Sequence, residues 1–286
     1  MDNMEKNRIE GSTLYLVATP IGNLADISER AKKVLCEVDF IAAEDTRNTA
    51  KLLSCLGIRG ELISYHEHNR RESGARITAR LAGGESCALV TDAGMPAISD
   101  PGEDIVRECH AMGIKVTAVP GCSAVVTALA LSGLSTSRFC FEGFLPPKSN
   151  ERKKILLSLA GEERTMIFYE APHKLKGTLA DMAEAFGEGR PATLCRELTK
   201  LNEEIIPGTL GAHVARYEQI EPRGEYVIVI AGAEPSTGVD DELSSLSPEE
   251  HVSHYERCGM PRMDAIKAAA RDRGLSKSEM YKLLHS

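Results

Sequence analysis

The sequence predicts an α/β protein with two α/β domains, a cleft between them and a small helical module at the C-terminal end. Up to about Gly121, short apolar and β-rich runs alternate with helical stretches, which is typical of βαβ units and a mainly parallel sheet. Beyond that residue the predicted strands lie closer together, which suits a second, mixed sheet. A chain of 286 residues also exceeds the usual size of one domain, so two packed domains and an appendage are expected.

The first domain is expected over residues 1–121. Asp26–Val38 and Gly102–Met112 carry apolar residues at helical spacing. Each of these stretches has acidic residues in its first turn, where the helix dipole favours negative charge. The five strands are predicted at Thr13–Thr19, Phe40–Asp45, Glu61–His66, Cys87–Gly94 and Lys115–Gly121.

The second domain is expected over residues 122–233. It begins with a helix of small residues, Ser123–Ser132. A helical stretch also separates its last two strands. The strands are predicted at Phe139–Leu145, Arg164–Pro172, Pro191–Leu198, Glu203–Leu210 and Glu225–Gly232.

The C-terminal part is predicted to be a linker, 234–247, followed by a helical module, 248–286. The linker is polar, contains Pro, Gly and Ser, and lacks periodicity. Ser247–Glu250 and Ser276–Glu279 have the capping-box pattern that begins helices, while Gly259 and Gly274 stand where helices end. Three short helices at about 248–258, 262–273 and 277–285 would make a helix-turn-helix-like module.

The charge distribution limits how this protein meets nucleic acid. The net charge of −8 argues against a protein that grips nucleic acid with its whole surface. From Glu234 to Glu250 there are six acidic residues and no basic one, whereas His251 to Ser286 carries seven Lys and Arg against four Asp and Glu. The pattern indicates a basic tail on an acidic tether, and both RNA contact and a packing or dimerisation role remain open for that tail.

Composition also points to a cytoplasmic protein. The longest apolar runs are too short to span a bilayer and the N-terminus shows no apolar signal segment, so neither membrane insertion nor secretion is expected. The eight cysteines form no C-x-x-C pair and are expected to be reduced and mostly buried. No metal site is expected, since the only dense group of ligand types is His66–His68, whose spacing more often marks a polar loop.

The loops that follow three predicted strands point to a ligand pocket. The sequence contains neither a P-loop motif nor a G-x-G-x-x-G after its first strand. Instead, Thr19–Asn23, Thr91–Gly102 and Val119–Ala124 follow strands and are rich in Gly, Pro and small residues, which let the backbone approach a ligand closely. Each loop alone is equally well explained as a tight turn. Three of them at one edge of a parallel sheet favour a cofactor pocket, because ligands bind at the carboxyl ends of such strands.

The order of these motifs resembles the tetrapyrrole-methylase fold family. TPIGN, TDAGMPAISDPG, VPGCSA, FYEAPHK and PRGEYVIVI carry the resemblance from Thr13 to Gly232, about four fifths of the chain. Within that family, LYLVATPIGNLADISERA, AAEDTR and YHEHN are similar to the branch of ribosomal RNA (cytidine-2′-O)-methyltransferases. The tail resembles that branch too. The tetrapyrrole enzymes usually read GPGD and GDP where this chain has PIGN and Gly94-Met95-Pro96, which weakens any claim to a porphyrinoid substrate.

The resemblance implies that S-adenosyl-L-methionine lies between the two domains, mostly against backbone. It further implies 2′-O-methylation of a cytidine in the decoding region of 16S ribosomal RNA, with small-subunit RNA or the 30S particle as partner, and a homodimer. The cofactor-binding residues implied by motif are Pro20, Ile21, Gly22, Asp92, Ala93, Gly94, Met95, Ile98, Ser123, Ala124, Phe168, Tyr169 and Leu198.

A ribose hydroxyl is a poor nucleophile at neutral pH, so a positioned proton acceptor is expected near the transferred methyl group. The catalytic candidates are His66, preferred here, with Glu44 and Asp45; His68, Glu170 and His173 are further possibilities. Glu44, Asp45 and Arg47 have an alternative interpretation as a structural ion-pair cluster. The expected RNA contacts are Arg47, Arg70, Arg71, Lys153, Lys154 and Lys174, with Lys148 and Arg152 as further candidates, although such cations often only face solvent.

Two rival functions remain open at this level. One is methylation of a tetrapyrrole or another small acceptor by the same fold. The other is a transcription regulator whose α/β part senses a ligand while the tail reads DNA. The nearly balanced charge of Ser276–Ser286 speaks against the second rival.

Overall fold

The computed structural model describes residues 8–234, 246–257, 259–273 and 275–284. These residues fall into two compact units. The first contains both β-sheets and ends at Ala231, while the second contains the C-terminal helices. Each unit is described separately.

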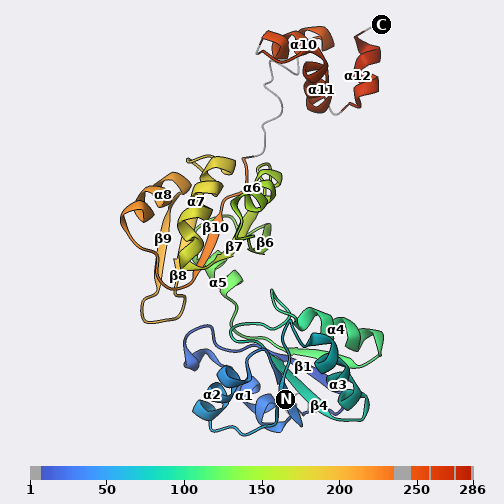
Figure 1. The fold of residues 1–286 in the computed structure, drawn as a ribbon, viewed down its shortest axis with the longest axis vertical. Coiled ribbons are helices and arrows are strands. Elements are labelled where there is room, and N and C mark those ends of the chain that lie inside the picture. Colours follow the sequence, from blue (N-terminus) through green and yellow to red (C-terminus); the bar gives the residue numbers. More distant parts are fainter. Residues whose placement is uncertain (1–7, 235–245, 258, 274, 285–286) are drawn as a thin grey trace, which may run out of the picture. The chain divides into compact units, whose positions relative to one another are not determined.

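The first sheet of the larger unit is entirely parallel, with strand order β3-β2-β4-β1-β5. Its central strands β1 and β4 are labelled in Figure 1. The predicted parallel sheet is therefore confirmed. Several predicted strands run past the observed ends, because the residues beyond those ends form the loops of the site. The strands are β1 (Thr13–Val17), β2 (Phe40–Ala43), β3 (Leu62–Ser64), β4 (Ser86–Val90) and β5 (Lys115–Val119).

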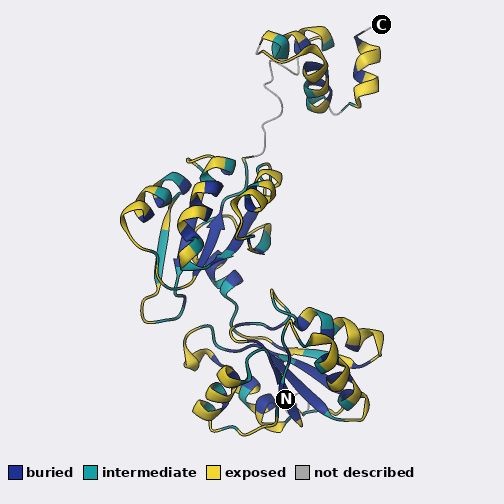
Figure 2. Ribbon diagram, viewed as in Figure 1, coloured by how far each residue is buried: buried dark blue, intermediate teal, exposed yellow. Residues whose placement is uncertain are grey.

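Helices cover both faces of this sheet, so alternate strand residues enter two different cores. Leu14 and Phe40 pack with α3 and α4 residues, whereas Tyr15 and Val17 pack with α1 and α2 residues. Figure 2 shows the resulting pattern of buried strands and helices with exposed outer faces. The helices are α1 (Glu29–Glu37), α2 (Thr46–Leu56), α3 (Arg70–Ala82) and α4 (Gly102–Ala111), with a short 3-10 helix η2 (Leu24–Asp26).

The helix predicted from Asp26 begins at Glu29 instead. Ser28 is its N-cap, and its side-chain oxygen accepts a hydrogen bond from the Ala31 N–H at 3.1 Å. Leu24–Asp26 forms the separate 3-10 turn. A capping serine thus decides where the apolar periodicity becomes a helix.

The order of the strands creates a switch point between β1 and β4. The chain leaves β1 through α1, which packs on one face, and leaves β4 through α4, which packs on the other. Since these two helices lie on opposite faces, the loops that leave the neighbouring strands β1 and β4 diverge. Such a divergence opens a crevice at the carboxyl ends of the strands, the usual ligand site of open α/β sheets.

The second sheet is mixed, as predicted, with order β6-β7-β10-β8-β9. Only β6 and β7 pair in parallel, and β10 runs antiparallel to both β7 and β8. α6, α7 and α8 residues pack on one face and α5 residues on the other. The elements are α5 (Ala124–Leu131), β6 (Phe139–Phe144), α6 (Ser149–Ser158), β7 (Thr165–Glu170), α7 (Pro172–Phe186), β8 (Pro191–Arg196), β9 (Glu204–Thr209), α8 (Leu210–Gln219) and β10 (Tyr226–Ile230).

The second unit holds α10 (Pro248–Arg257), α11 (Arg262–Asp272) and α12 (Lys277–Leu283) around a small apolar core. Both predicted capping boxes are confirmed: Ser247 and Glu250 exchange hydrogen bonds of 2.8 and 3.3 Å, and Ser276 and Glu279 do the same. Gly259 follows α10 with φ of +90°. The predicted cap Gly274 and most of the predicted linker lie outside the described residues.

Two further features concern composition. No helix in the described ranges is long and apolar enough to cross a membrane. Seven cysteines are described, all as free thiols, and only Cys87, Cys109 and Cys195 are buried. The expectation that most cysteines are buried is therefore wrong for this part of the chain, since Cys36 and Cys55 lie on the exposed sides of amphipathic helices.

Candidate active site

A cavity of about 480 Å³ in the larger unit is lined by residues from both sheets. The first sheet contributes the loops after β1, β2 and β4, including Ile21, Glu44 and Gly94. The second sheet contributes the ends of β7 and β8 and the start of β10, including Tyr169 and Val227. A volume of this size is in the range of sites for small organic ligands.

A bridge joins the loops after β1 and β4, and one of its two residues, Gly94, lines the cavity. Thr19 and Gly94 exchange two backbone hydrogen bonds, of 2.9 and 3.1 Å. The Thr19 hydroxyl also donates to the Thr91 carbonyl at 3.1 Å. Gly94 has φ of +85°, a conformation that side chains with a Cβ rarely adopt. The bridge therefore brings the two diverging loops together at the switch point and requires glycine there.

Asp100 holds the rest of the loop after β4. Its Oδ1 accepts hydrogen bonds from the Ala97 and Gly102 N–H groups, at 3.0 and 2.7 Å. Ala97 and Ser99 both have positive φ, so this loop is strained. The other carboxylate oxygen, Oδ2, is buried and has no hydrogen-bond partner among the described residues. Burial raises the pKa of Asp100, more than the hydrogen bonds from Gly102 and Ala97 lower it.

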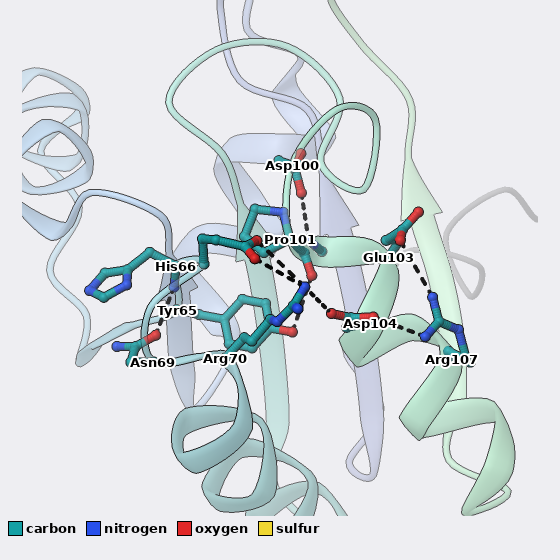
Figure 3. A network of polar contacts seen from close by, with 11 residues as sticks. Tyr65, His66, Asn69, Arg70, Asp100, Pro101, Glu103, Asp104 and Arg107 are labelled. Atoms are coloured by element: carbon teal, nitrogen blue, oxygen red, sulfur yellow. Dashed lines mark hydrogen bonds and ion pairs between the residues drawn. The ribbon is translucent and has the colours of Figure 1, made fainter. Parts of the chain in front are cut away.

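A second set of contacts anchors this loop to β3 and α3 (Figure 3). The Tyr65 hydroxyl donates to the Pro101 carbonyl at 3.2 Å, and Arg70 pairs with Asp104 at 2.8 Å. Burial raises the pKa of Tyr65 to about 12, so its hydroxyl remains a donor across the physiological range. These contacts hold the end of the loop and the start of α4 against the residues that follow β3.

Carboxylates dominate the charge of the cavity wall. Glu44 accepts a hydrogen bond from the Thr91 hydroxyl at 2.6 Å, and Asp92 accepts one from the Asn48 amide at 3.0 Å. Desolvation raises the pKa of Asp92, more than the Asn48 hydrogen bond lowers it, and nearby Glu44 raises it further. Among the described residues of the lining, the only ammonium group belongs to Lys200. Five carboxylates line the cavity: Glu44, Asp92, Asp100, Glu170 and Glu225. The site therefore attracts a cation.

The second sheet contributes an apolar and aromatic wall. Tyr169 packs against Phe141 and Phe144, with ring centroids 4.9 and 5.4 Å apart. Glu170 is buried and accepts hydrogen bonds from the Ala171 N–H at 2.8 Å and the Thr178 hydroxyl at 2.5 Å, which engages both of its oxygens. The combined arrangement suits a cationic ligand with hydroxyl or amino donors and a flat apolar part.

Most residues implied as cofactor contacts come together in this cavity. Pro20, Gly22 and Phe168 are not among the lining residues. Phe168 is fully buried in the core with the helices, because successive strand residues face opposite sides and Tyr169 faces the cavity. Gly22 lies against the 198–200 segment, where a Cβ would come within 2.8 Å of the Thr199 hydroxyl oxygen. The lining residues among those predicted are Ile21, Asp92, Ala93, Gly94, Met95, Ile98, Ser123, Ala124, Tyr169 and Leu198.

Of the catalytic candidates in EDTR and YHEHN, only Glu44 lines the cavity. Asp45 is the N-cap of α2 and pairs with Arg47 at 2.8 Å, and these hydrogen bonds hold the pKa of its carboxyl well below its usual range. His66 lies in the loop after β3 (Figure 3), where its backbone N–H donates to Asn69 at 2.8 Å. The structure therefore supports the ion-pair interpretation for Asp45 and leaves His66 away from the cavity wall.

The predicted RNA-contacting cations lie on four helices, α2, α3, α6 and α7. Arg47, Arg70 and Lys153 are engaged in ion pairs with Asp45, Asp104 and Glu184. Arg71 and Lys154 are exposed, and Lys174 is half-buried. Arg152 cannot serve as a surface contact, because it is buried in an ion pair with Asp181 of 2.5 Å.

Several lining residues were missed by sequence reasoning, among them Phe144, Cys195, Lys200, Glu225 and Val227. The ligand-site rule for parallel sheets points only to residues after the carboxyl ends of strands. β10 runs antiparallel to β7 and β8, so its first residues reach the same edge, with Tyr226 opposite Glu170 and Arg196. Strand alternation would have identified Cys195 had the face of β8 been known.

No group of three or more metal-ligating side chains occurs within the described ranges. His66 and His68 have ring centroids 5.9 Å apart.

Comparisons with known proteins identify relatives over nearly the full length. The family model described as Tetrapyrrole (Corrin/Porphyrin) Methylases matches residues 13–213. The chain is 46% identical over 281 residues to "Ribosomal RNA small subunit methyltransferase I" of Halalkalibacterium halodurans, covering 98% of this chain and 97% of that protein. It is 46% identical over 275 residues to the protein of the same name from Bacillus subtilis, covering 95% of this chain and 94% of that one.

Among solved structures, the uroporphyrin-III C-methyltransferase of Thermus thermophilus complexed with S-adenosylhomocysteine is similar, with a TM-score of 0.54. The likeness covers 77% of this chain and 97% of that one at 18% identity, so it concerns the fold alone.

Proposed function

Since the chain belongs to the tetrapyrrole methylase family and, within it, to the ribosomal RNA small subunit methyltransferases I, we propose that it methylates a cytidine ribose 2′-hydroxyl in small-subunit ribosomal RNA with S-adenosylmethionine as donor. The observation that carries the proposal is the carboxylate-lined cavity at the β1–β4 switch point. Its chemistry suits the donor, whose sulfonium and ammonium groups are cationic. The acceptor is taken to be an exposed loop of the RNA, which can admit one nucleotide to a cleft. We further propose a homodimer acting in the cytoplasm.

The residues that hold the donor are proposed from the shape of the wall. When bound, S-adenosylmethionine supplies an electrophilic methyl group on a positively charged sulfur. The buried Asp100 Oδ2, which has no partner among described residues, would accept a hydrogen bond from a hydroxyl or ammonium group of the donor. Tyr169 and Leu198 would pack against its adenine, and the Gly94 backbone permits close approach. Ser123 makes no capping bond within α5, so its hydroxyl is available to a ligand.

Glu44 is proposed as the proton acceptor for the ribose hydroxyl. It is the one catalytic candidate of the EDTR and YHEHN motifs in the cavity wall. Its Oε2 is oriented by the Thr91 hydroxyl at 2.6 Å, and Thr91 in turn is fixed through its carbonyl to Thr19. Methyl transfer depends mainly on alignment of the reacting groups, and a positioned base adds to it.

We predict that Glu44→Gln lowers kcat by about 100-fold or more, because a positioned general base contributes a factor on the order of 10²–10⁴. The glutamine side chain retains the size and an oxygen that can accept from Thr91, so donor affinity should fall far less than kcat, by the loss of one of five carboxylates. Single-turnover methylation of small-subunit RNA measures the first effect and calorimetry the second. Glu103→Gln, on the exposed side of α4, is the matched control. A Glu44→Gln enzyme with wild-type kcat would show that Glu44 is not the base.

The raised pKa values of Asp92 and Asp100 predict pH-dependent donor binding. Below these raised pKa values the carboxylates are protonated and lose their attraction for a cation, so affinity should fall on acidification, starting above the usual range of aspartate. Asp100→Asn should weaken binding at pH 7 by about 10- to 100-fold, the size of a hydrogen bond to a charged group. Its remaining side-chain oxygen can still accept from Ala97 and Gly102. Titration calorimetry of the wild type between pH 7 and pH 5 measures the fall in donor affinity. Equal donor affinities of the wild type and Asp100→Asn at pH 7 would contradict a role of Asp100 in donor binding.

The function itself is tested by offering labelled S-adenosylmethionine to the enzyme with small-subunit RNA, with assembled 30S particles and with uroporphyrinogen. We expect label in RNA, at a ribose that then resists alkaline cleavage of the neighbouring phosphodiester. Label confined to uroporphyrinogen would establish the tetrapyrrole alternative. Absence of S-adenosylmethionine binding together with sequence-specific binding of duplex DNA would support the alternative function of a transcription regulator.

A further inference from the structure

We infer that a second pocket beside the donor cavity is a binding site for a backbone phosphate of the RNA, an inference that rests on the proposed function. This pocket, called the arginine pocket here, has a volume of about 430 Å³ and includes Arg196, Arg216 and Arg223 in its lining. The sequence patterns did not indicate an RNA-contacting role for any of the three arginines. They come from the end of β8, from α8 and from the turn before β10, and only the folded sheet brings them together.

The arginine pocket is held in shape by hydrogen bonds of its own residues. Arg196 Nε donates to the Arg223 carbonyl at 2.7 Å, which ties the end of β8 to the turn before β10. The Arg223 N–H donates to the Tyr226 hydroxyl at 3.3 Å. Both backbone polar groups of Arg223 are therefore hydrogen-bonded, so the turn is held in one conformation and the pocket is preorganised for a ligand.

The charge of the arginine pocket is positive in a chain whose net charge is −8. Glu204 is shared by two guanidinium groups, with Arg196 Nη1 at 3.4 Å and Arg216 Nη2 at 2.7 Å. The other carboxylate of the lining, Glu221, pairs with Lys176 at 2.5 Å.

Arg223 forms no ion pair within the described part of the chain and is exposed. A guanidinium group has five N–H donors, and the hydrogen bonds of Arg196 and Arg216 use only a few of them. Free donors on planar guanidinium groups are the preferred partners of phosphate oxygens. The arginine pocket thus suits an anion with several oxygen acceptors.

The position of the arginine pocket connects it to the donor cavity. Tyr226 lines both cavities. Cys195 lines the donor cavity and the next residue of β8, Arg196, lines the arginine pocket. Consecutive strand residues face opposite sides, so the two sites lie on opposite faces of the second sheet and adjoin at the end of β8 and the start of β10. A nucleotide whose ribose enters the donor cavity has a phosphate on either side along the strand. An RNA strand that passes this end of the sheet would bring one of its phosphates to the arginine pocket, and such contacts set the register of the RNA.

The test uses the full chain with Arg223→Ala, Arg223→Glu and Arg216→Ala, and Arg76→Ala as the control, an exposed arginine of α3 outside both cavities. We expect Arg223→Ala to raise the KM for small-subunit RNA about tenfold, as for the loss of one hydrogen-bonded charge contact, and Arg223→Glu to raise it further. kcat at saturating RNA and the Kd for S-adenosylmethionine should stay within twofold of wild type. The slope of log affinity against log salt should fall by about one.

Anisotropy with a labelled single-stranded RNA gives a readout that needs no methyl transfer, so the two proposals can fail separately. Weaker RNA binding by Arg223→Glu supports the phosphate site even if the wild type methylates another acceptor. Unchanged RNA affinity and salt slope in all three variants, with an active wild type, would overturn the inference and leave the function intact. Calorimetric binding of inorganic phosphate that is lost in Arg223→Glu, with RNA binding unaffected, would identify a small-anion site and would also overturn it.

Discussion

Gly94→Val is expected to lower the affinity for S-adenosylmethionine by at least about 100-fold while the chain stays folded. Gly94 has φ of +85°, where a β-branched residue costs about 1–3 kcal/mol of strain. A Cβ at this position would stand 3.5 Å from Ile21 and 3.7 Å from the Cys122 carbonyl, and the two valine methyl groups would extend further. Since Gly94 and Ile21 both line the donor cavity, the substitution fills ligand space and disturbs the Thr19–Gly94 bridge.

The matched control is Gly113→Val. Gly113 has a similar φ of +70° but lies in the turn after α4, with no atom within 4 Å of an added Cβ. Both variants should lose stability in thermal unfolding, because both place valine in left-handed backbone. Only Gly94→Val should lose donor binding in calorimetry. Equal affinity of the two variants would show that the loop after β4 is a turn without a role in binding.

Arg152→Ala is expected to lower the free energy of unfolding of the larger unit by about 3–5 kcal/mol, the cost of breaking a buried ion pair from one side. The side chains of Arg152 and Asp181 are only 8% and 10% exposed, and their closest atoms lie 2.5 Å apart. Arg152 also donates to the carbonyls of Pro146 and Pro147 before α6. Its removal leaves the Asp181 carboxylate buried with Ser149 at 3.0 Å and the more distant Lys153 at 3.7 Å.

Urea unfolding followed by circular dichroism measures this effect. The neighbouring Lys153→Ala is the control, since Lys153 is 37% exposed and surface ion pairs contribute about 0–1 kcal/mol. The double substitution Arg152→Met with Asp181→Leu should recover much of the loss, because it removes both charges together. A destabilisation by Arg152→Ala no larger than that by Lys153→Ala would mean that Asp181 is satisfied without Arg152.

The sequence was most informative where structure is local. The Ser276–Glu279 capping box needs only four consecutive residues, and it is present as predicted. The loop after β4 could be recognised because Gly94 permits a positive φ and Pro96 fixes φ, both within a few residues. By contrast, Arg152 looked like a surface cation, since its partner Asp181 is 29 residues away on another helix. Local patterns contain no information about such partners.

The same limit explains the catalytic candidates. Glu44 and Asp45 are adjacent and chemically alike, but Asp45 is used to cap α2 while Glu44 enters the cavity wall. His66 follows a strand of the same sheet, yet β3 is the edge strand and the cavity lies at β1 and β4. The rule that ligands bind after parallel strands identifies an edge of the sheet, and the strand order selects the place along that edge.

The amino-acid sequence by itself determined the two kinds of sheet, the glycine- and proline-shaped loops and the capped C-terminal helices, because these depend on alternation, φ restriction and short-range hydrogen bonds. Only the tertiary structure decided which residues face the cavity, since this depends on strand order and on which side of a strand each side chain takes. It also decided that Arg196, Arg216 and Arg223 share one pocket, because β8, α8 and the turn before β10 meet only when the sheet is folded.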